Sequence, residues 1–153
     1  MSGFEIGKVL ENTLKKRFKK GSVLLELGSG EGTQRLSEHF EMMSVESEKK
    51  FVDKYDSIYI HAPIDKRTNW FTIEPLKYLG FNYDAILIDA PRAIPEDARL
   101  GFLDNMDLFN LEVPIFVDDT HRPSEHKLAV ELSKRLKRPM TKFEDEGKSF
   151  III

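Results

Sequence analysis

The residues of this chain with the clearest capacity for chemistry are carboxylates that stand at the ends of short apolar runs. Apolar runs bounded by turn residues are typical of buried strands in a parallel sheet. The carboxyl ends of such strands lie at one edge of the sheet, where ligands bind. We therefore expect these side chains to converge there. They are Glu26, Glu46, Asp89, Asp118 and Asp119.

Alternating glycines follow the first apolar run, at Gly28, Gly30 and Gly32. Glycine permits a positive φ and lets a ligand approach bare backbone, and the helix expected next presents unsatisfied N–H groups. The spacing is not that of a dinucleotide-binding turn, because Thr33 stands where its third glycine would be. The chain also has no P-loop motif. The pattern predicts a strand, a turn and a helix that bind a nucleotide-type ligand; the alternative is a glycine-rich turn that binds nothing.

The segment Glu26-x-Gly28-x-Gly30-x-Gly32 resembles motif I of the class I S-adenosylmethionine-dependent methyltransferases, E/D-x-G-x-G-x-G. The resemblance covers nearly the whole chain. The cofactor of that family has an ammonium and a sulfonium but no phosphate, so a carboxylate beside the turn is favourable. The resemblance implies that the cofactor, S-adenosyl-L-methionine, contacts residues in and around the turn, namely Glu26, Gly28, Ser29, Gly30, Gly32 and Thr33.

Glu46 follows the glycines at the distance where an acidic residue binds the ribose hydroxyls in βαβ units, about 20 residues on. The methyltransferases have the same feature, so the resemblance implies ribose binding by Glu46. It also extends the cofactor site to Ser47, Ile64 and Asp89. A third strand is expected at 57–60, and the resemblance implies that Asp65, shortly after it, accepts a hydrogen bond from the adenine amine.

The stretch Asp89-Ala90-Pro91-Arg92 lacks the aromatic residue of [D/N]-P-P-[Y/F], a motif of enzymes that methylate base amino groups. Asp89, Asp118 and Asp119 instead resemble the acidic residues of metal-dependent O-methyltransferases, of the catechol, caffeoyl-CoA and macrocin types. That resemblance implies a hydroxyl acceptor and Mg²⁺ held by these three carboxylates. A hard divalent ion lowers the pKa of a bound hydroxyl. In the metal-free alternative, Asp118 hydrogen-bonds loop backbone and Asp119 faces water.

His121 and Arg122 directly follow the acidic pair. A histidine there could act as a general base, and an arginine could hold a carboxylate or phosphate of the acceptor. The alternative is an ordinary surface pair. The chain lacks the long insertions that shape the acceptor pocket in those families. A second subunit in a homodimer, the segments 67–79 and 92–107, or a macromolecular substrate could complete it.

The elements that must position these residues follow from the periodicity of apolar side chains. Residues 4–19 have the spacing of an amphipathic helix, a further helix is expected from Ser47 as its cap, and another covers 124–136. Residues 139–153 predict a closing hairpin, in which Gly147 has a positive φ. The fold class is α/β: a three-layer α/β/α Rossmann-like methyltransferase fold with a mostly parallel seven-stranded sheet and a C-terminal antiparallel hairpin. We expect one domain over 1–153, with an N-terminal helix (1–20) and a core (21–153).

Composition excludes several functions. The 153 residues include no Cys, which removes disulfides, thiolate zinc sites and cysteine nucleophiles. No apolar run could span a membrane, so we expect a cytoplasmic protein without a membrane partner. The net charge of −3 gives no general sign of nucleic-acid binding, although residues 15–20 are locally basic.

The function that these patterns predict is S-adenosylmethionine-dependent O-methylation of a small-molecule or sugar hydroxyl. Two alternatives stay open. One is an RNA or protein methyltransferase that docks through the basic segment at 15–20, and the other is a non-catalytic Rossmann-like binding subunit.

Overall fold

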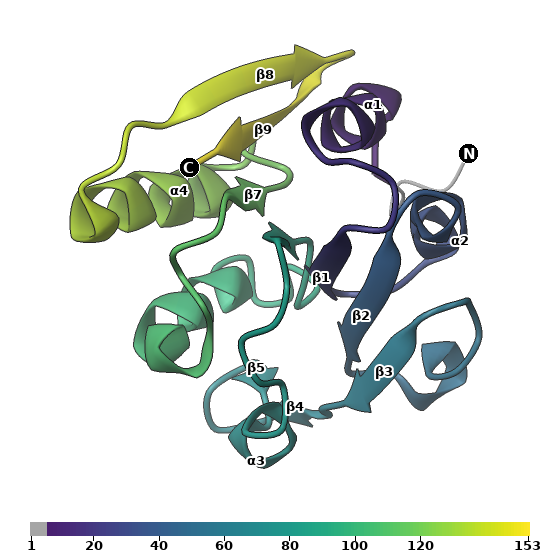
Figure 1. Ribbon diagram of the computed structural model, residues 1–153. Coiled ribbons are helices and arrows are strands. Elements are labelled where there is room, and N and C mark those ends of the chain that lie inside the picture. Colours follow the sequence, from purple (N-terminus) through teal and green to yellow (C-terminus); the bar gives the residue numbers. More distant parts are fainter. Residues whose placement is uncertain (1–5) are drawn as a thin grey trace.

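Strand β1 (Val23–Leu27) lies in the middle of a seven-stranded sheet in the computed structural model, which describes residues 6–153 (Figure 1). The order of the strands is β3-β2-β1-β6-β7-β9-β8. All pairs from β3 to β7 are parallel, and β9 is antiparallel to both of its neighbours. This confirms the predicted sheet and its closing hairpin. The other strands of the sheet are β2 (Glu41–Glu46), β3 (Ile58–His61), β6 (Ala85–Ile88), β7 (Ile115–Val117), β8 (Thr141–Asp145) and β9 (Lys148–Ile152).

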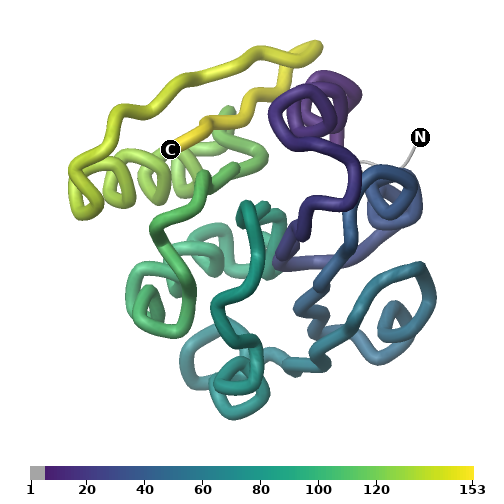
Figure 2. Tube along the Cα trace, in the orientation of Figure 1, coloured from purple at the N-terminus to yellow at the C-terminus, as the bar shows by residue number. Residues whose placement is uncertain are grey.

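The chain path has a reversal beside β1 (Figure 2). From β1 the chain runs outward through β2 to β3, then returns to the other side of β1 as β6 and continues to the opposite edge. At such a switch point the connections leave β1 and β6 in opposite directions, which opens a crevice beyond their carboxyl ends. The glycine turn directly follows β1 and Asp89 directly follows β6, so these predicted site residues lie at the crevice.

Both faces of the sheet are covered, which explains why its central strands are apolar on both sides. On one face, Leu24 and Leu87 pack with helices α1 (Lys8–Arg17) and α2 (Glu31–Ser37). On the other face, Leu25 and Ile86 belong to a second core. The elements over that face are α3 (Ile73–Leu76), η2 (Ala98–Leu108) and α4 (Pro123–Leu136).

Two of the expected helices differ from those in the structure. The helix expected over 4–19 is observed as α1, which covers only Lys8–Arg17, and the expected start at residue 4 lies outside the described residues. The prediction of a helix capped by Ser47 is wrong, because the connection holds only the 3₁₀ turn η1 (Lys49–Phe51), preceded by Glu48. Charged and polar residues dominate this connection, so it has no continuous apolar face with which to stabilise a longer helix against the sheet.

The connection after β3 is a small hairpin of β4 (Ile64–Asp65) and β5 (Trp70–Phe71). Trp70 and Phe71 are both buried in the core under η2, where Gly101 leaves room for the Trp70 ring. The C-terminal hairpin turns at Gly147, with φ +83°, as predicted. None of the helices within residues 6–153 has the length and hydropathy needed to cross a membrane.

Gly28 determines how closely the ends of β1 and β6 approach. Its φ is +98°, and a Cβ there would lie 2.6 Å from the Cβ of Ala90. Gly80 also has a positive φ, +67°, but nothing lies within 4 Å of where its Cβ would be.

We expect Gly28→Ala to lower the free energy of unfolding by about 2 to 4 kcal/mol, because backbone strain and overlap with Ala90 add. The matched control Gly80→Ala should cost about 1 kcal/mol, from strain alone. Urea unfolding followed by circular dichroism measures both. Equal losses would show that the contact with Ala90 is not important for stability.

Candidate functional site

Glu26 lies at the carboxyl end of β1, but its side chain is buried beneath the glycine turn. Its Oε2 accepts hydrogen bonds from the hydroxyls of Thr33, at 2.6 Å, and Ser44. Burial raises the pKa of Glu26 to about 7, although these two hydrogen bonds oppose the rise. Glu26 therefore joins the start of α2 to β2 and supports the turn from below.

Glu46 holds the turn from the side. Its Oε1 accepts a hydrogen bond from the N–H of Ser29 at 2.9 Å, and its Oε2 accepts one from the N–H of Glu48 at 2.8 Å. Ser29 Oγ lies 2.8 Å from the hydroxyl of Tyr59 on β3. The strand end, the turn and the neighbouring strand are thus fixed relative to one another.

A cavity of about 280 Å³ lies against this turn, and we name it the turn cavity. It brings together several predicted cofactor residues: Gly28, Ser29, Gly30, Glu46 and Ser47. Gly32 and Thr33 are buried behind the turn and do not line it. The turn cavity also brings in Lys50, Phe51, Lys54 and Tyr55 from the β2–β3 connection. Basic and aromatic residues alternate in this stretch, and that signal could have indicated a binding wall.

A third cavity, of about 340 Å³, shares Ser47, Glu48 and Arg92 with the turn cavity and includes Ile64. Asp65 is not among the residues that line it, because its carboxylate is paired with Arg67 at 3.1 Å within the β4–β5 hairpin. Of these two predicted cofactor residues, the structure places Ile64 at this cavity and Asp65, predicted to face the adenine, outside it.

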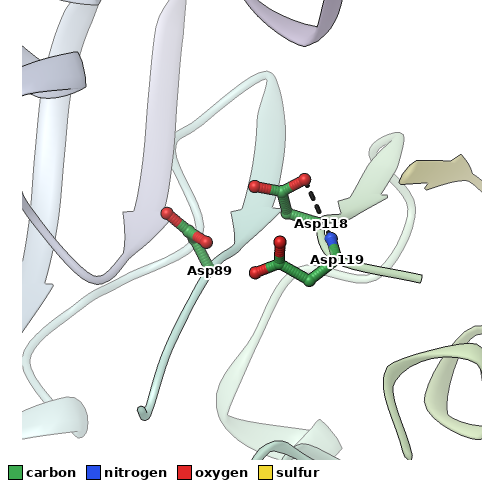
Figure 3. Close-up of side chains that lie close together, drawn as sticks. All are labelled: Asp89, Asp118 and Asp119. Carbon is green, nitrogen blue, oxygen red and sulfur yellow. Dashed lines mark hydrogen bonds between the residues drawn. The ribbon is translucent and has the colours of Figure 1, made fainter. Parts of the chain in front are cut away.

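Asp89, Asp118 and Asp119 form the acidic cluster at the ends of β6 and β7 (Figure 3). Each offers one carboxylate oxygen within 4.8 Å of the others. One carboxylate oxygen of Asp118 accepts the N–H of Asp119 at 2.8 Å. Asp119 itself has a φ of 60°, a left-handed conformation that is uncommon outside glycine. The prediction that the strand ends bring these residues together is confirmed.

The acidic cluster is crowded with negative charge. Burial raises the pKa of Asp118 to about 6, and the charge of Asp119 adds to the rise. Burial also raises the pKa of Asp89 well above its usual range, with a further contribution from Asp118 that Arg99 opposes. A cation placed among these groups would relieve the repulsion.

One such cation is the guanidinium of Arg99, which comes from η2 and is 5% exposed. It donates to Asp119 Oδ2 at 3.0 Å and lies 3.7 Å from Asp89 Oδ1. It also donates to the backbone oxygens of Pro91 and Asp89, at 3.0 and 2.9 Å. Arg99 carries no sequence signal that would single it out, since its position follows from how η2 packs.

A cavity of about 480 Å³ opens over this cluster, and we name it the acidic cavity. Its wall includes Arg122 and Glu125, at the start of α4. Glu125 is fully buried, lies 3.5 Å from Arg122 and has an Oε1 that accepts no hydrogen bond from the described residues. Burial raises the pKa of Glu125, while Arg99 and Arg122 oppose the rise. His121 is exposed and is not among the lining residues, whereas Arg122 is.

Arg92 lines the turn cavity, the third cavity and the acidic cavity. The predicted cofactor residues that line the turn cavity and the predicted acceptor residues that line the acidic cavity therefore lie on two sides of one junction, at the switch point of the sheet. This arrangement can hold a ligand against the glycine turn and present a second molecule to the carboxylates.

The sequence matches no protein-family model and no curated protein sequence. Solved structures do match. A candidate caffeoyl-CoA O-methyltransferase from Staphylococcus aureus aligns with 97% of this chain and 84% of its own, at 12% identity and a TM-score of 0.58. The M1A22 tRNA methyltransferase TrmK from B. subtilis aligns with 97% of this chain and 65% of its own, at 13% identity and 0.53.

A third match is the methyltransferase MycE from the mycinamycin biosynthetic pathway, solved in complex with Mg and SAH. It aligns with 94% of this chain and 44% of its own, at 10% identity and a TM-score of 0.53. The chain thus spans less than two thirds of the length of TrmK and less than half that of MycE. These similarities show that the chain has the class I methyltransferase fold, and at such low identity they show the fold alone.

The raised pKa of Glu26 makes stability depend on pH. The pKa is about 7 in the folded chain and near 4.5 when the chain is unfolded. Between these values the folded state keeps a proton that the unfolded state has lost, so the contribution of Glu26 to stability is full at low pH and is lost as the pH rises through 7. Glutamine cannot ionise. We therefore expect the free energy of unfolding of Glu26→Gln, relative to that of the wild type, to increase by about 3 kcal/mol when the pH is raised from about 4.5 to about 8.

Urea unfolding at both pH values measures this difference, with the exposed Glu38→Gln as the control that should show no such trend. A difference in the free energy of unfolding between wild type and Glu26→Gln that stays constant with pH would contradict the expectation.

Proposed function

We propose that this chain is an S-adenosylmethionine-dependent methyltransferase. The observation that carries the proposal is the turn cavity, where bare backbone at Gly28 and Gly30 faces the carboxylate of Glu46 at the switch point of a class I methyltransferase fold. Carboxylate oxygens suit the two hydroxyls of a ribose. The cavity wall also carries lysines and further carboxylates, which suit the two charges of an amino-acid group. The residues present therefore fit this cofactor, which would supply a methyl group from its sulfonium centre.

The proposed acceptor is the hydroxyl of a small polar molecule bound in the acidic cavity. The charged groups over this cavity, including Asp89, Asp119 and Arg122, can accept and donate hydrogen bonds, and Ile94 and Pro123 add apolar surface. An alcohol loses its proton as its oxygen is methylated. A group beside the acceptor must therefore accept that proton or stabilise the negative charge that develops on the oxygen. The carboxylates at the ends of β6 and β7 lie where they can hold the hydroxyl and receive the proton.

The work left to the protein is mainly alignment. Fixed strand ends on both sides of the junction hold two ligands at a set separation, and orientation of this kind can contribute several kcal/mol to the rate. Glu46 and the turn would orient one partner, while Asp89 and Asp119 would orient the other. Arg122, half-buried at the cavity wall, would contact the part of the acceptor that does not react.

We also propose that the acidic cluster holds a divalent cation such as Mg²⁺. Clustered carboxylate oxygens are the ligands that this ion prefers, and the mutual repulsion of Asp89, Asp118 and Asp119, which adds to the raised pKa values of Asp89 and Asp118, supports a place for added positive charge. The bond from Arg99 uses Oδ2 of Asp119 and leaves its Oδ1 available to a cation. When bound, the ion would lower the pKa of the acceptor hydroxyl.

The alternative of an RNA or protein acceptor docked through the basic segment 15–20 has less support. This segment precedes β1, so it lies at the amino ends of the strands, the edge opposite the cavities. Two of its charges are engaged within the chain: Lys15 pairs with Glu11 at 3.2 Å, and Arg17 lies over the ring of Phe143. A substrate held there would have to reach around the sheet.

Calorimetric titration with S-adenosylmethionine and with S-adenosylhomocysteine tests the cofactor. We expect micromolar binding in the wild type and a loss of about tenfold or more in Glu46→Gln, because the amide has one accepting oxygen where the carboxylate has two. Glu41→Gln is the matched control, since Glu41 is exposed at the other end of the same strand. No binding of either compound by the wild type would refute the proposed function, and equal losses in the two variants would refute the role of Glu46.

Titration with Mg²⁺ tests the cation separately. The wild type should release or take up heat that disappears in Asp118→Asn, because removing one of three carboxylates removes both a ligand and a charge. Asp107→Asn, an exposed change on η2, should bind as the wild type does. Heat that persists in Asp118→Asn would place the ion elsewhere.

A further inference from the structure

The guanidinium of Arg99 is buried among the carboxylates at the ends of β6 and β7. Its Nη1 donates to Asp119 Oδ2 at 3.0 Å and lies 4.0 Å from Glu125 Oε2. Its Nη2 lies 3.7 Å from Asp89 Oδ1. Three carboxylates from three different parts of the chain therefore lie against one guanidinium, and an arginine keeps its charge at any pH at which the protein is folded. Arg122 Nη1, at the edge of the cluster, lies 3.6 Å from Asp119 Oδ2 and 3.5 Å from Glu125 Oε2. Of these two arginines, only Arg99 also reaches Asp89.

Arg99 is held in this position independently of the carboxylates. Its Nε donates to the backbone oxygen of Pro91, and its Nη2 donates to the backbone oxygen of Asp89. These two bonds attach the guanidinium to the segment that leaves β6. Its charge thus belongs to the frame of the site and would not be displaced by small movements of the acidic side chains.

A divalent ion bound to the acidic cluster would lie close to this fixed charge, because both contact the same carboxylates. Like charges at that separation repel each other strongly where water is largely excluded. Without any ion, in contrast, Arg99 gives Asp119 a partner and keeps the cluster assembled. Positioning of the carboxylates and weakening of the metal site are consequences of the same contact.

We propose that Arg99 is the resident cation of the acidic cluster, a positioning residue that holds Asp119 in place in the absence of metal and makes the cluster a weak site for divalent cations. The inference rests on the proposed function, which assigns the cluster to the acceptor. It means that the acceptor side is formed before a metal binds, and that cation affinity reflects a competition with the protein's own charge.

Binding of Mn²⁺ to the purified full chain, measured by calorimetry and by electron paramagnetic resonance, tests the proposal. Arg99→Gln keeps a donor for the backbone oxygens but removes the charge, and it should bind Mn²⁺ about tenfold more tightly than wild type. Arg99→Lys keeps the charge and should stay within about twofold of wild type. Tighter binding in Arg99→Gln supports the proposal. Binding seen only in that variant would also support the role of Arg99, and it would refute the separate proposal that the wild-type cluster holds a divalent cation. Equal or weaker binding in Arg99→Gln, or binding in none of the three proteins, overturns it.

The control is Arg138→Gln, which removes another arginine whose guanidinium is bonded to backbone oxygens, those of Leu111 and Val113, away from the cluster. It should bind Mn²⁺ as wild type does; a gain there equal to that of Arg99→Gln would also overturn the proposal. If Arg99→Gln does not fold, the wild type decides the matter by NMR. Its Arg99 Nε–H signal should shift on addition of Mg²⁺, and an unchanged signal while Mg²⁺ binds would overturn the proposal.

The cofactor titration separates this inference from the proposed function. Arg99 does not line the turn cavity, so S-adenosylmethionine should bind Arg99→Gln and wild type with the same affinity. Failure of the wild type to bind S-adenosylmethionine would refute the methyltransferase proposal. Equal or weaker binding of Mn²⁺ by Arg99→Gln would refute the role of Arg99 and would leave the methyltransferase proposal unaffected.

Discussion

Burial of negative charge at one edge of a parallel sheet is the constraint on which this structure depends. The parallel strands of the sheet all end at this edge, and five of the carboxylates at or just beyond their ends are wholly or largely buried. A buried carboxylate without partners is costly, so each must find a donor or keep its proton. The arrangement of the site follows from how these charges are satisfied.

The solutions differ along the edge. Glu26 is satisfied by the hydroxyls of Thr33 and Ser44, which bring no charge, and its pKa consequently rises to about 7. Glu46 is satisfied by the N–H groups of Ser29 and Glu48, which ties it to the turn. The acidic cluster instead uses the full charge of a guanidinium. The same edge thus has a hydrogen-bonded side against the turn and an ionic side under the acidic cavity, and Arg92 lies where the two meet.

The elements that surround this edge are small. The connection between β2 and β3 has only the turn η1, and α3 has a single turn. The β2–β3 connection nevertheless contributes much of the wall of the turn cavity, and the β4–β5 hairpin contributes to the wall of the third cavity. Around the acidic cavity, the wall comes mainly from the segment after β6 and from the first turn of α4.

The sequence by itself determined the central strands, the glycine turn, the closing hairpin and the convergence of the carboxylates. These features depend on local patterns: an apolar run predicts a buried strand, Gly28 and Gly147 permit a positive φ, and parallel strands end at a common edge. Only the tertiary structure decided that Glu26 faces Thr33 beneath the turn, that Asp65 is paired with Arg67, and that Ser47 does not begin a helix. It also decided the role of Arg99, which meets Asp119 across 20 residues of chain. No local pattern encodes that contact, because it depends on how η2 packs over the sheet, and the energy of a buried ion pair exists only once both partners have been removed from water together.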